Sequence, residues 1–146
     1  MGVIAERLAP CGPVVDAKAA ERAREIIADT WSGPALDQAW PALAPVFGAS
    51  GYLASLARRD PRMLGRILES EPDARLADVL ARTAAAAALD TEAATVELRK
   101  LKAELHLLTA LADLGGVWDL DQVTGALTRF ADAAVASALT VAARGE

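Results

Sequence analysis

Two aspartates that follow a pair of glycines are the residues of this chain best placed, by type and spacing, to do chemistry. Gly115 and Gly116 form a predicted turn, and Asp119 and Asp121 follow within a few residues. A glycine turn can approach a triphosphate, and an Asp-x-Asp pair can hold the metal ions that activate an attacking oxygen. The order fits such a site but the spacing does not, because no helix and strand separate the glycines from the carboxylates. We therefore expect Gly115 to end one helix at a positive φ and Asp119 to cap the next.

A second group of charged residues surrounds Asp60. Its arginines are Arg58, Arg59, Arg62 and Arg66. Such a cluster could hold a phosphate or dock an acidic partner. It is also typical of a solvated face, on which local ion pairs each contribute less than about 1 kcal/mol. Both interpretations stay open from the residue types alone.

The single histidine and the single cysteine offer no catalytic or metal-binding pattern. His106 has no carboxylate three or four residues away, so we expect it at a surface or an interface. Cys11 has no partner for an internal disulfide, which fits a reducing cytoplasm. We assign no catalytic, cofactor-binding or metal-binding residue to this chain, and no cofactor.

The composition favours one all-α domain over residues 1–146. The chain is 53% hydrophobic, largely through alanine, which favours helices. A net charge of −5 and few aromatic residues argue against nucleic-acid binding. The sequence contains no run of about 18 apolar residues free of charge, so we expect no transmembrane helix. The N-terminus lacks the pattern of a signal peptide. We expect a cytoplasmic bundle of about five to seven helices.

Apolar periodicity and capping residues place the shorter helices. Residues 17–30 follow Asp16, residues 52–59 follow Ser50, and a further helix begins at Asp60 and Pro61. A helix that includes the alanine run 84–88 comes next. Between the first two, Pro41 and Pro45 predict short helical turns or a kinked helix over residues 35–46.

The element that dominates the predicted bundle is a long helical hairpin over residues 91–143. The first helix carries the stripe Leu98, Leu101, Leu105 and Leu108, and we expect it to face Val123, Leu127 and Phe130 on the second helix. The second helix carries another apolar stripe, made of Ala131, Val135, Ala138 and Ala142. Helices apolar over so wide an arc usually pack on two sides. We therefore predict self-association of the isolated chain through its C-terminal helix.

Three passages resemble one enzyme family. LRKLKAELHLLTALADLGG with LDQVTGALTRFADAAV (within residues 98–135), VFGASGYLASLARRDP (residues 46–61) and GPVVDAKAAERA (residues 12–23) occur in the expected order. Together they resemble the N-terminal helical part of bacterial bifunctional glutamine synthetase adenylyltransferase/adenylyl-removing enzymes. In that family the helical hairpin lies just before the first of two nucleotidyltransferase domains.

The resemblance implies a parent enzyme that adds AMP to, and removes it from, a tyrosine of glutamine synthetase in nitrogen regulation. It implies Mg and ATP as cofactors of the parent enzyme, and glutamine synthetase, a PII signalling protein and the catalytic domain after residue 146 as partners. The glycine turn and acidic pair of the catalytic domains have no match here. We therefore expect an inactive N-terminal fragment that supports the adenylyl-removing domain. The alternative is a free-standing helical module that binds a protein partner through an apolar groove.

Overall fold

The computed structural model describes residues 2–145, and these residues form eight α-helices, a turn of 3₁₀-helix and no strand. The elements in chain order are α1 (Ile4–Arg7), α2 (Ala17–Thr30), α3 (Pro34–Ala49), α4 (Gly51–Arg59), α5 (Pro61–Leu68), α6 (Pro72–Ala85), the 3₁₀ turn η1 (Ala86–Ala88), α7 (Thr91–Leu114) and α8 (Leu120–Gly145). The predicted all-α bundle is confirmed. The number of helices exceeds the expected five to seven, because the single turn α1, of four residues, adds one more.

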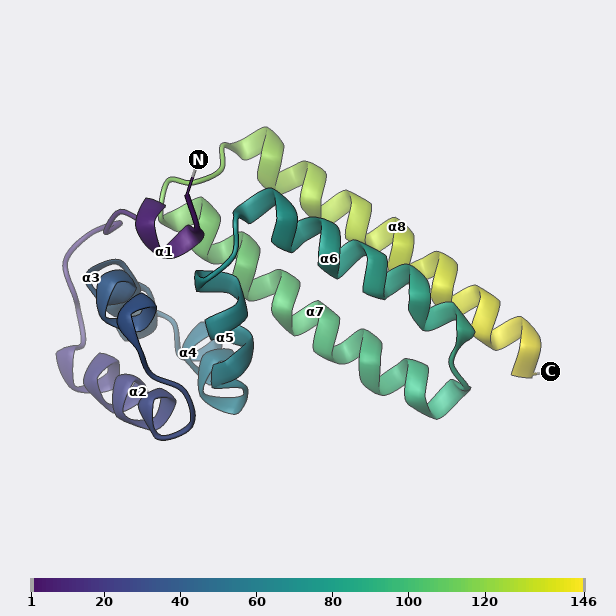
Figure 1. Ribbon diagram of the computed structural model, residues 1–146, viewed down its shortest axis with the longest axis horizontal. Coiled ribbons are helices and arrows are strands. Elements are labelled where there is room, and N and C mark those ends of the chain that lie inside the picture. The colour runs from purple at the N-terminus through teal and green to yellow at the C-terminus, as the bar shows by residue number, and fades with distance from the viewer. Residues whose placement is uncertain (1, 146) are drawn as a thin grey trace.

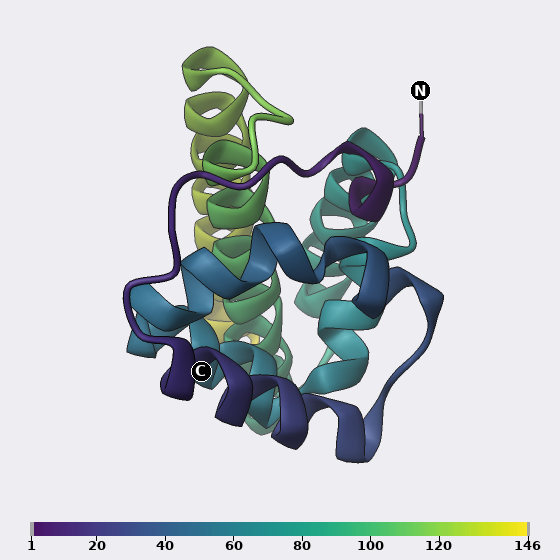
Figure 2. The ribbon, with the colours of Figure 1, turned by 90° about the vertical axis from the view of Figure 1, so that its left-hand side faces the viewer.

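The helices are arranged as an elongated three-helix layer with a cluster of shorter helices at one end (Figure 1). α6, α7 and α8 run side by side in alternating directions, and each packs against the other two. The shorter helices α3, α4 and α5 contact α7, and α2 lies against α3 at the outer side of the cluster (Figure 2). α7 therefore belongs to both parts and carries most of the contacts between them.

Short polar side chains begin four of the helices before α8 where the sequence predicts a start. Each accepts a hydrogen bond from a backbone N–H three residues later, which satisfies one otherwise free donor of the first turn. The pairs are Asp16 with Ala19 (2.9 Å), Ser50 with Leu53 (3.1 Å), Asp60 with Met63 (3.1 Å) and Asp90 with Ala93 (2.8 Å). The predicted boundaries of α7 are confirmed by this arrangement.

Of the two alternatives expected at the prolines of α3, separate short turns are excluded, because α3 is one helix of 16 residues with Pro41 and Pro45 inside it. Each proline removes a backbone donor and costs about 3 kcal/mol in a helix interior. The burial of α3 offsets this cost, since the helix packs against α1, α2, α4, α5 and α7. Trp40, Leu43 and Phe47 lie in its buried face.

The long antiparallel pair of α7 and α8 is confirmed, but the predicted register was wrong in part. Leu105 is 1% exposed, as expected, whereas Leu127 is 41% exposed. α8 contacts both α6 and α7, and its most buried row is Ala126, Phe130, Ser137 and Val141. The small side chains at 126 and 137 suit a position against two helices at once, and the Ser137 hydroxyl donates to the Thr83 carbonyl of α6 at 2.6 Å. The larger Leu127 points away from this contact.

The glycine that takes a positive φ after α7 is Gly116 (φ 75°), so the prediction for Gly115 was wrong. Gly115 has a right-handed conformation (φ −81°, ψ −1°) and donates its N–H to the Leu111 carbonyl at 2.8 Å. A Cβ at Gly115 would overlap the Leu8 side chain and come within 2.7 Å of the Leu111 oxygen. Position 115 therefore needs glycine because of a close approach, and position 116 because of its backbone angle.

Segments near both ends of the chain are bound to distant parts of it. The Ile4 N–H donates to the Ser70 carbonyl at 2.8 Å, and the Ala9 N–H donates to the Gly115 carbonyl at 2.9 Å. At the other end of the molecule, the Arg144 guanidinium donates to the carbonyls of Ala87 and Leu89. These bonds fix α1 over the turn between α7 and α8, and fix the end of α8 beside the turn between α6 and α7.

By length and composition alone, α8 meets the minimum for a membrane-crossing helix, and it is the one such helix among residues 2–145. A single helix of this kind is weak evidence for a membrane span. Arg129 and Asp132 also lie in the middle of α8, where a charge is costly in a bilayer.

Candidate functional site

A buried carboxylate bound by three arginines joins α5, α6 and α7. The Glu104 side chain of α7 is 1% exposed, and each of the three guanidinium groups lies 3.3 Å from one of its oxygens. The arginines are Arg66 of α5 and Arg75 and Arg82 of α6. Asp78 completes the network, at 3.0 Å from Arg75 and 3.4 Å from Arg82. We call Glu104, Asp78 and the three arginines the Glu104 network.

The charged groups of the Glu104 network are paired with one another, so they are engaged in structure. Burial alone would lower the pKa of Arg82, but Glu104 and Asp78 outweigh it and raise the pKa of Arg82 above its ordinary value. Charge-assisted hydrogen bonds from the three arginines occupy both Glu104 oxygens. The arrangement is suited to holding three helices in register.

Glu104 was not predicted as a functional residue from the sequence, although two signals mark it. Glu104 lies three and seven residues before Leu107 and Leu111, so it falls in a buried apolar row of α7. Arg75 and Arg82 are seven residues apart and share one face of α6. A carboxylate in an apolar row, together with paired arginines on a neighbouring helix, predicts a buried ion pair.

Of the glycines and aspartates at the turn from α7 to α8, Asp119 takes the capping role predicted for it. The Asp119 carboxylate accepts from the Gln122 N–H at 2.8 Å, and the Gln122 side chain accepts from the Asp119 N–H at 2.9 Å. This reciprocal pair is a capping box. Asp121 is exposed on the first turn of α8. Within residues 2–145 no group of three or more His, Cys, Asp or Glu side chains is placed to hold a metal ion.

The arginines around Asp60 do not form one cluster in the structure. Arg66 binds Glu104, and the Asp60 carboxylate accepts from the Met63 N–H as the cap of α5. Among residues 2–145, no ion pair joins Asp60 to an arginine. The local ion pairs expected around Asp60 are therefore absent from the described part of the chain, and Arg58, Arg59 and Arg62 remain without a carboxylate partner there.

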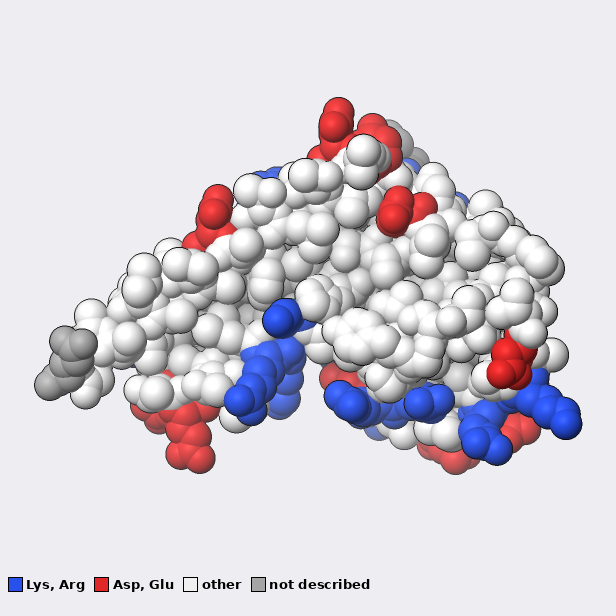
Figure 3. Space-filling view, turned by 180° about the vertical axis from the view of Figure 1, so that it is seen from behind, with Lys and Arg blue, Asp and Glu red and all other residues white. Residues whose placement is uncertain are grey.

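Arg59 instead joins cations of α7 around a groove of about 310 Å³. The groove is lined by Leu56, Arg59, Asp60, Met63, Arg99, Lys100 and Ala103, and we call it the basic groove. Its apolar side chains come from α4, α5 and α7, and its cations stand at the rim. Figure 3 shows lysine and arginine side chains gathered along one edge of the molecule, on both sides of a recess, while much of the same face is uncharged.

A second groove lies beside the basic groove, on the side of α7 that faces α8. It has a volume of about 290 Å³ and is lined by Thr95, Leu98, Arg99, Lys102, Phe130 and Ala134. We call it the α7–α8 groove. Arg99 lines both grooves, so the two adjoin at this residue, and each combines apolar side chains with exposed cations.

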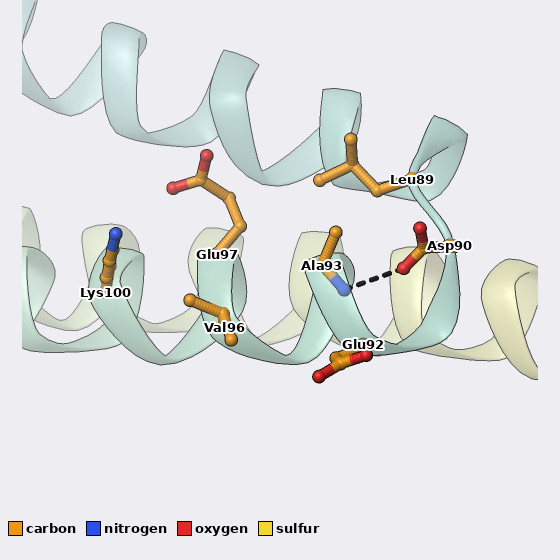
Figure 4. A pocket seen from close by; sticks show the side chains of 7 residues that line it. All are labelled: Leu89, Asp90, Glu92, Ala93, Val96, Glu97 and Lys100. Atoms are coloured by element: carbon orange, nitrogen blue, oxygen red, sulfur yellow. Dashed lines mark hydrogen bonds between the residues drawn. The ribbon is translucent and has the colours of Figure 1, made fainter.

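A larger hollow, of about 420 Å³, lies beside the turn between α6 and α7 (Figure 4). Two of its acidic side chains already have partners: Asp90 caps α7 through the Ala93 N–H, and Glu97 lies 3.6 Å from Arg82. Glu92 points away from the other labelled side chains in Figure 4. These residues do not converge on a common point, so this hollow is a weaker candidate than the basic groove.

His106 lies at the contact between α7 and α4, where the Tyr52 hydroxyl and the His106 Nδ1 are 2.8 Å apart. Burial, and secondarily the positive charge of Lys102, lower the pKa of His106 below its ordinary value of 6.5. The predicted interface position is confirmed. Cys11 is a free cysteine, exposed in the N-terminal segment.

The outer side of α8 is apolar. Val135 is 58% exposed and Leu139 is 65% exposed. Ala131, Ala138 and Ala142 of the predicted second stripe are exposed as well. The predicted exposure of this stripe is confirmed.

The fold and these surfaces define an all-helical bundle with apolar and basic faces and a buried structural network. The sequence model of the family described as glutamate-ammonia ligase adenylyltransferase matches residues 40–146. The chain therefore belongs to this family.

Its relatives include proteins named bifunctional glutamine synthetase adenylyltransferase/adenylyl-removing enzyme. The chain is 61% identical to that of Caulobacter vibrioides over 100% of its own length and 15% of the relative's. It is 45% identical to that of a Rhodopseudomonas palustris strain (77% and 12%) and 48% identical to that of a Bradyrhizobium species (66% and 10%). The chain thus spans about a seventh of the length of the Caulobacter relative. No solved structure matches the chain.

Proposed function

We propose that this chain is the N-terminal helical region of an enzyme that adenylylates and deadenylylates glutamine synthetase. The observation that carries the proposal is the 61% identity over the full chain to 15% of a relative with that name. The region does no chemistry itself in this proposal. It supports the adenylyl-removing domain, which lies after residue 146.

The partners and cofactors of the whole enzyme belong to the same proposal. Glutamine synthetase is the substrate protein, a PII signalling protein sets the balance of the two activities, and Mg and ATP serve the nucleotidyltransferase domains. The enzyme acts in the cytoplasm. None of these groups is assigned to a residue of this chain, since the only carboxylate pair near a glycine turn serves as a helix start in the described residues.

The exposed stripe of α8 is the surface that supports the adenylyl-removing domain in this proposal. Burial of apolar area contributes roughly 25 cal/mol per Å², so a stripe along much of a 26-residue helix is a substantial docking surface. In the isolated chain the stripe is left to water or to a second copy of the chain.

Two assays test the proposed role. The first measures phosphate-dependent release of ADP from adenylylated glutamine synthetase. We expect no turnover with this chain alone, and turnover above background would contradict the proposal. The second uses the enzyme without this region, whose activity we expect to be reduced and then restored by adding the chain. A Val135→Lys, Leu139→Lys variant should fail to restore it, whereas Lys18→Glu, an exposed change on α2, should restore it fully.

The alternative, a free-standing interaction module, is favoured by the grooves on α7. The two functions differ in the gene sequence beyond the codon for Glu146. Continuation into a glycine-rich turn and an Asp-x-Asp strand supports the enzyme region, whereas a stop codon in an intact genome supports the module.

A further inference from the structure

The charges of this chain are divided unevenly over its surface. Six cations lie along the end of α4, the start of α5 and the middle of α7: Arg58, Arg59, Arg62, Arg99, Lys100 and Lys102. One carboxylate, Asp60, lies among them. The rest of the chain has nine lysines and arginines against 19 aspartates and glutamates. A strongly acidic protein therefore has a local basic surface.

These cations are not used by the fold. Among residues 2–145, none of the six takes part in an ion pair, whereas Arg24, Arg66, Arg75 and Arg82 all do. Asp60 is the carboxylate nearest in sequence to the arginines of α4 and α5, and its side chain is engaged in capping α5. Glu97 and Glu104, the carboxylates nearest to the cations of α7, are engaged with arginines outside the group. Unpaired like charges that are held close together repel one another, so the arrangement is a cost to folding that an acidic partner would offset.

The apolar floor distinguishes this surface from a general site for polyanions. Leu56, Met63 and Ala103 lie beneath the rim of the basic groove, and Leu98, Phe130 and Ala134 lie in the α7–α8 groove. A phosphate backbone gains nothing from such a floor. The aromatic side chain that lines these grooves, Phe130, is 8% exposed, which leaves little of its ring for a base to stack on. The acidic remainder of the chain also repels long polyanions. Alternating apolar and acidic side chains match the surface better.

We propose that the basic groove and the α7–α8 groove together bind an acidic amphipathic helix of a partner protein. Apolar residues of that helix occupy the two groove floors, and its carboxylates pair with Arg59, Arg99 and Lys102. Thr95 and Ala103 mark the ends of the surface on α7, about 12 Å apart at 1.5 Å per residue. This distance corresponds to two to three helical turns of the bound segment. The proposal does not depend on the proposed function, because it uses only the surface of this chain.

The test is a selection of helical peptides of about 15 residues from a display library in which both the apolar and the charged positions are randomised. The bait is this chain, and the counter-selection bait is its Arg59→Glu, Arg99→Glu variant. We expect enriched peptides to carry apolar residues at i, i+3 and i+4 and an excess of aspartate and glutamate. Enriched peptides without an acidic excess, or a selection without enrichment over the counter-bait, would overturn the proposal.

Binding of one enriched peptide then tests the site itself. Arg59→Glu, Arg99→Glu should weaken the binding at least about tenfold, and raising the salt concentration should weaken it further. The matched control Arg22→Glu reverses an exposed charge on α2 and should leave the affinity unchanged. Ala103→Glu introduces a like charge into the groove floor and should weaken binding with both arginines intact. Circular dichroism and thermal melting confirm that each variant is folded before it is scored.

Two other occupants are outcomes that contradict the proposal. A self-association that the Arg59→Glu, Arg99→Glu variant abolishes in sedimentation would show that a second copy of the chain occupies the surface. Tighter binding of a single-stranded oligonucleotide than of any selected peptide, lost in the same variant, would show a nucleic-acid site.

Discussion

Glu104 is the residue on which the packing of three helices depends. Removal of one partner from a buried ion pair leaves the other charges uncompensated and costs about 3–5 kcal/mol. We predict that Glu104→Gln lowers the free energy of unfolding by about 3 kcal/mol, the lower end of this range, because Arg66 and Arg82 can turn toward solvent. Urea unfolding measures the change.

The matched control for Glu104 is Glu97→Gln on the same helix. Glu97 pairs with Arg82 at 3.6 Å but is partly exposed, so its loss should cost less than about 1 kcal/mol. Equal effects of the two changes would show that the Glu104 network contributes no more than a surface ion pair.

His106 gives the stability a defined pH dependence. Its pKa is lowered in the folded chain and returns to about 6.5 on unfolding. Between these two pKa values the unfolded chain binds more protons, so the free energy of unfolding rises with pH there. The contribution is complete above about pH 6.5 and is lost as the pH falls through the folded pKa.

Melting temperatures from pH 5 to 8 measure this contribution as the difference between the wild-type chain and His106→Gln. We expect the difference to change over the acid side of this range and to be constant above it. A Lys102→Met variant should raise the pKa of His106 in an NMR titration, because it removes a nearby positive charge. An unchanged histidine titration in that variant would contradict the assigned cause.

Among the elements, the turn between α7 and α8 is where a single glycine matters most. We predict that Gly115→Ala lowers the free energy of unfolding by more than about 1 kcal/mol, through overlap with Leu8 and the Leu111 oxygen. The control is Gly125→Ala in α8, where a Cβ meets nothing within 4 Å. That change should stabilise the chain by roughly 0.5–1 kcal/mol through helix propensity. Thermal melts of both variants distinguish steric overlap from propensity.

The register of α7 against α8 is tested by one leucine on each helix. Leu105→Ala should cost roughly 2–5 kcal/mol, because its side chain on α7 is buried by neighbouring helices. Leu127→Ala on the exposed side of α8 should change the free energy of unfolding by less than about 0.5 kcal/mol. Similar costs at the two positions would mean that α8 is rotated from the orientation described.

Local features of the sequence predict the elements better than their contacts. Asp16, Ser50, Asp60 and Asp90 identify helix starts because a cap bonds only within its own turn. The continuity of α3 depends on five other helices, so its prolines alone mislead. The rotation of α8 depends on α6 as well as α7, which the hairpin pattern does not contain. Glu104 was missed for the same reason, since its partners lie 22 to 38 residues away.

For the molecule as a whole, the exposed side of α8 predicts association of the isolated chain. We expect light scattering over a concentration series to show a rising mass, because Val135 and Leu139 lie on an apolar stripe. Val135→Lys, Leu139→Lys should restore the monomer. Lys18→Glu, which changes an exposed charge on α2, should leave the association unchanged. A constant monomer mass at all concentrations would contradict association through the exposed side of α8.

The bond between Ala9 and Gly115 also bears on the order in which the chain can fold during synthesis. Ala9 is synthesised before Gly115, so the carbonyl that it binds is made more than a hundred residues later. The Ile4 N–H likewise can form its bond only after Ser70 has been made. Contacts so distant in sequence are slow to form because a long loop must close first. The segment from Ile4 to Ala9 thus reaches its final position only after Gly115 has been made, and until then Ile4 and Leu8 are available to chaperones.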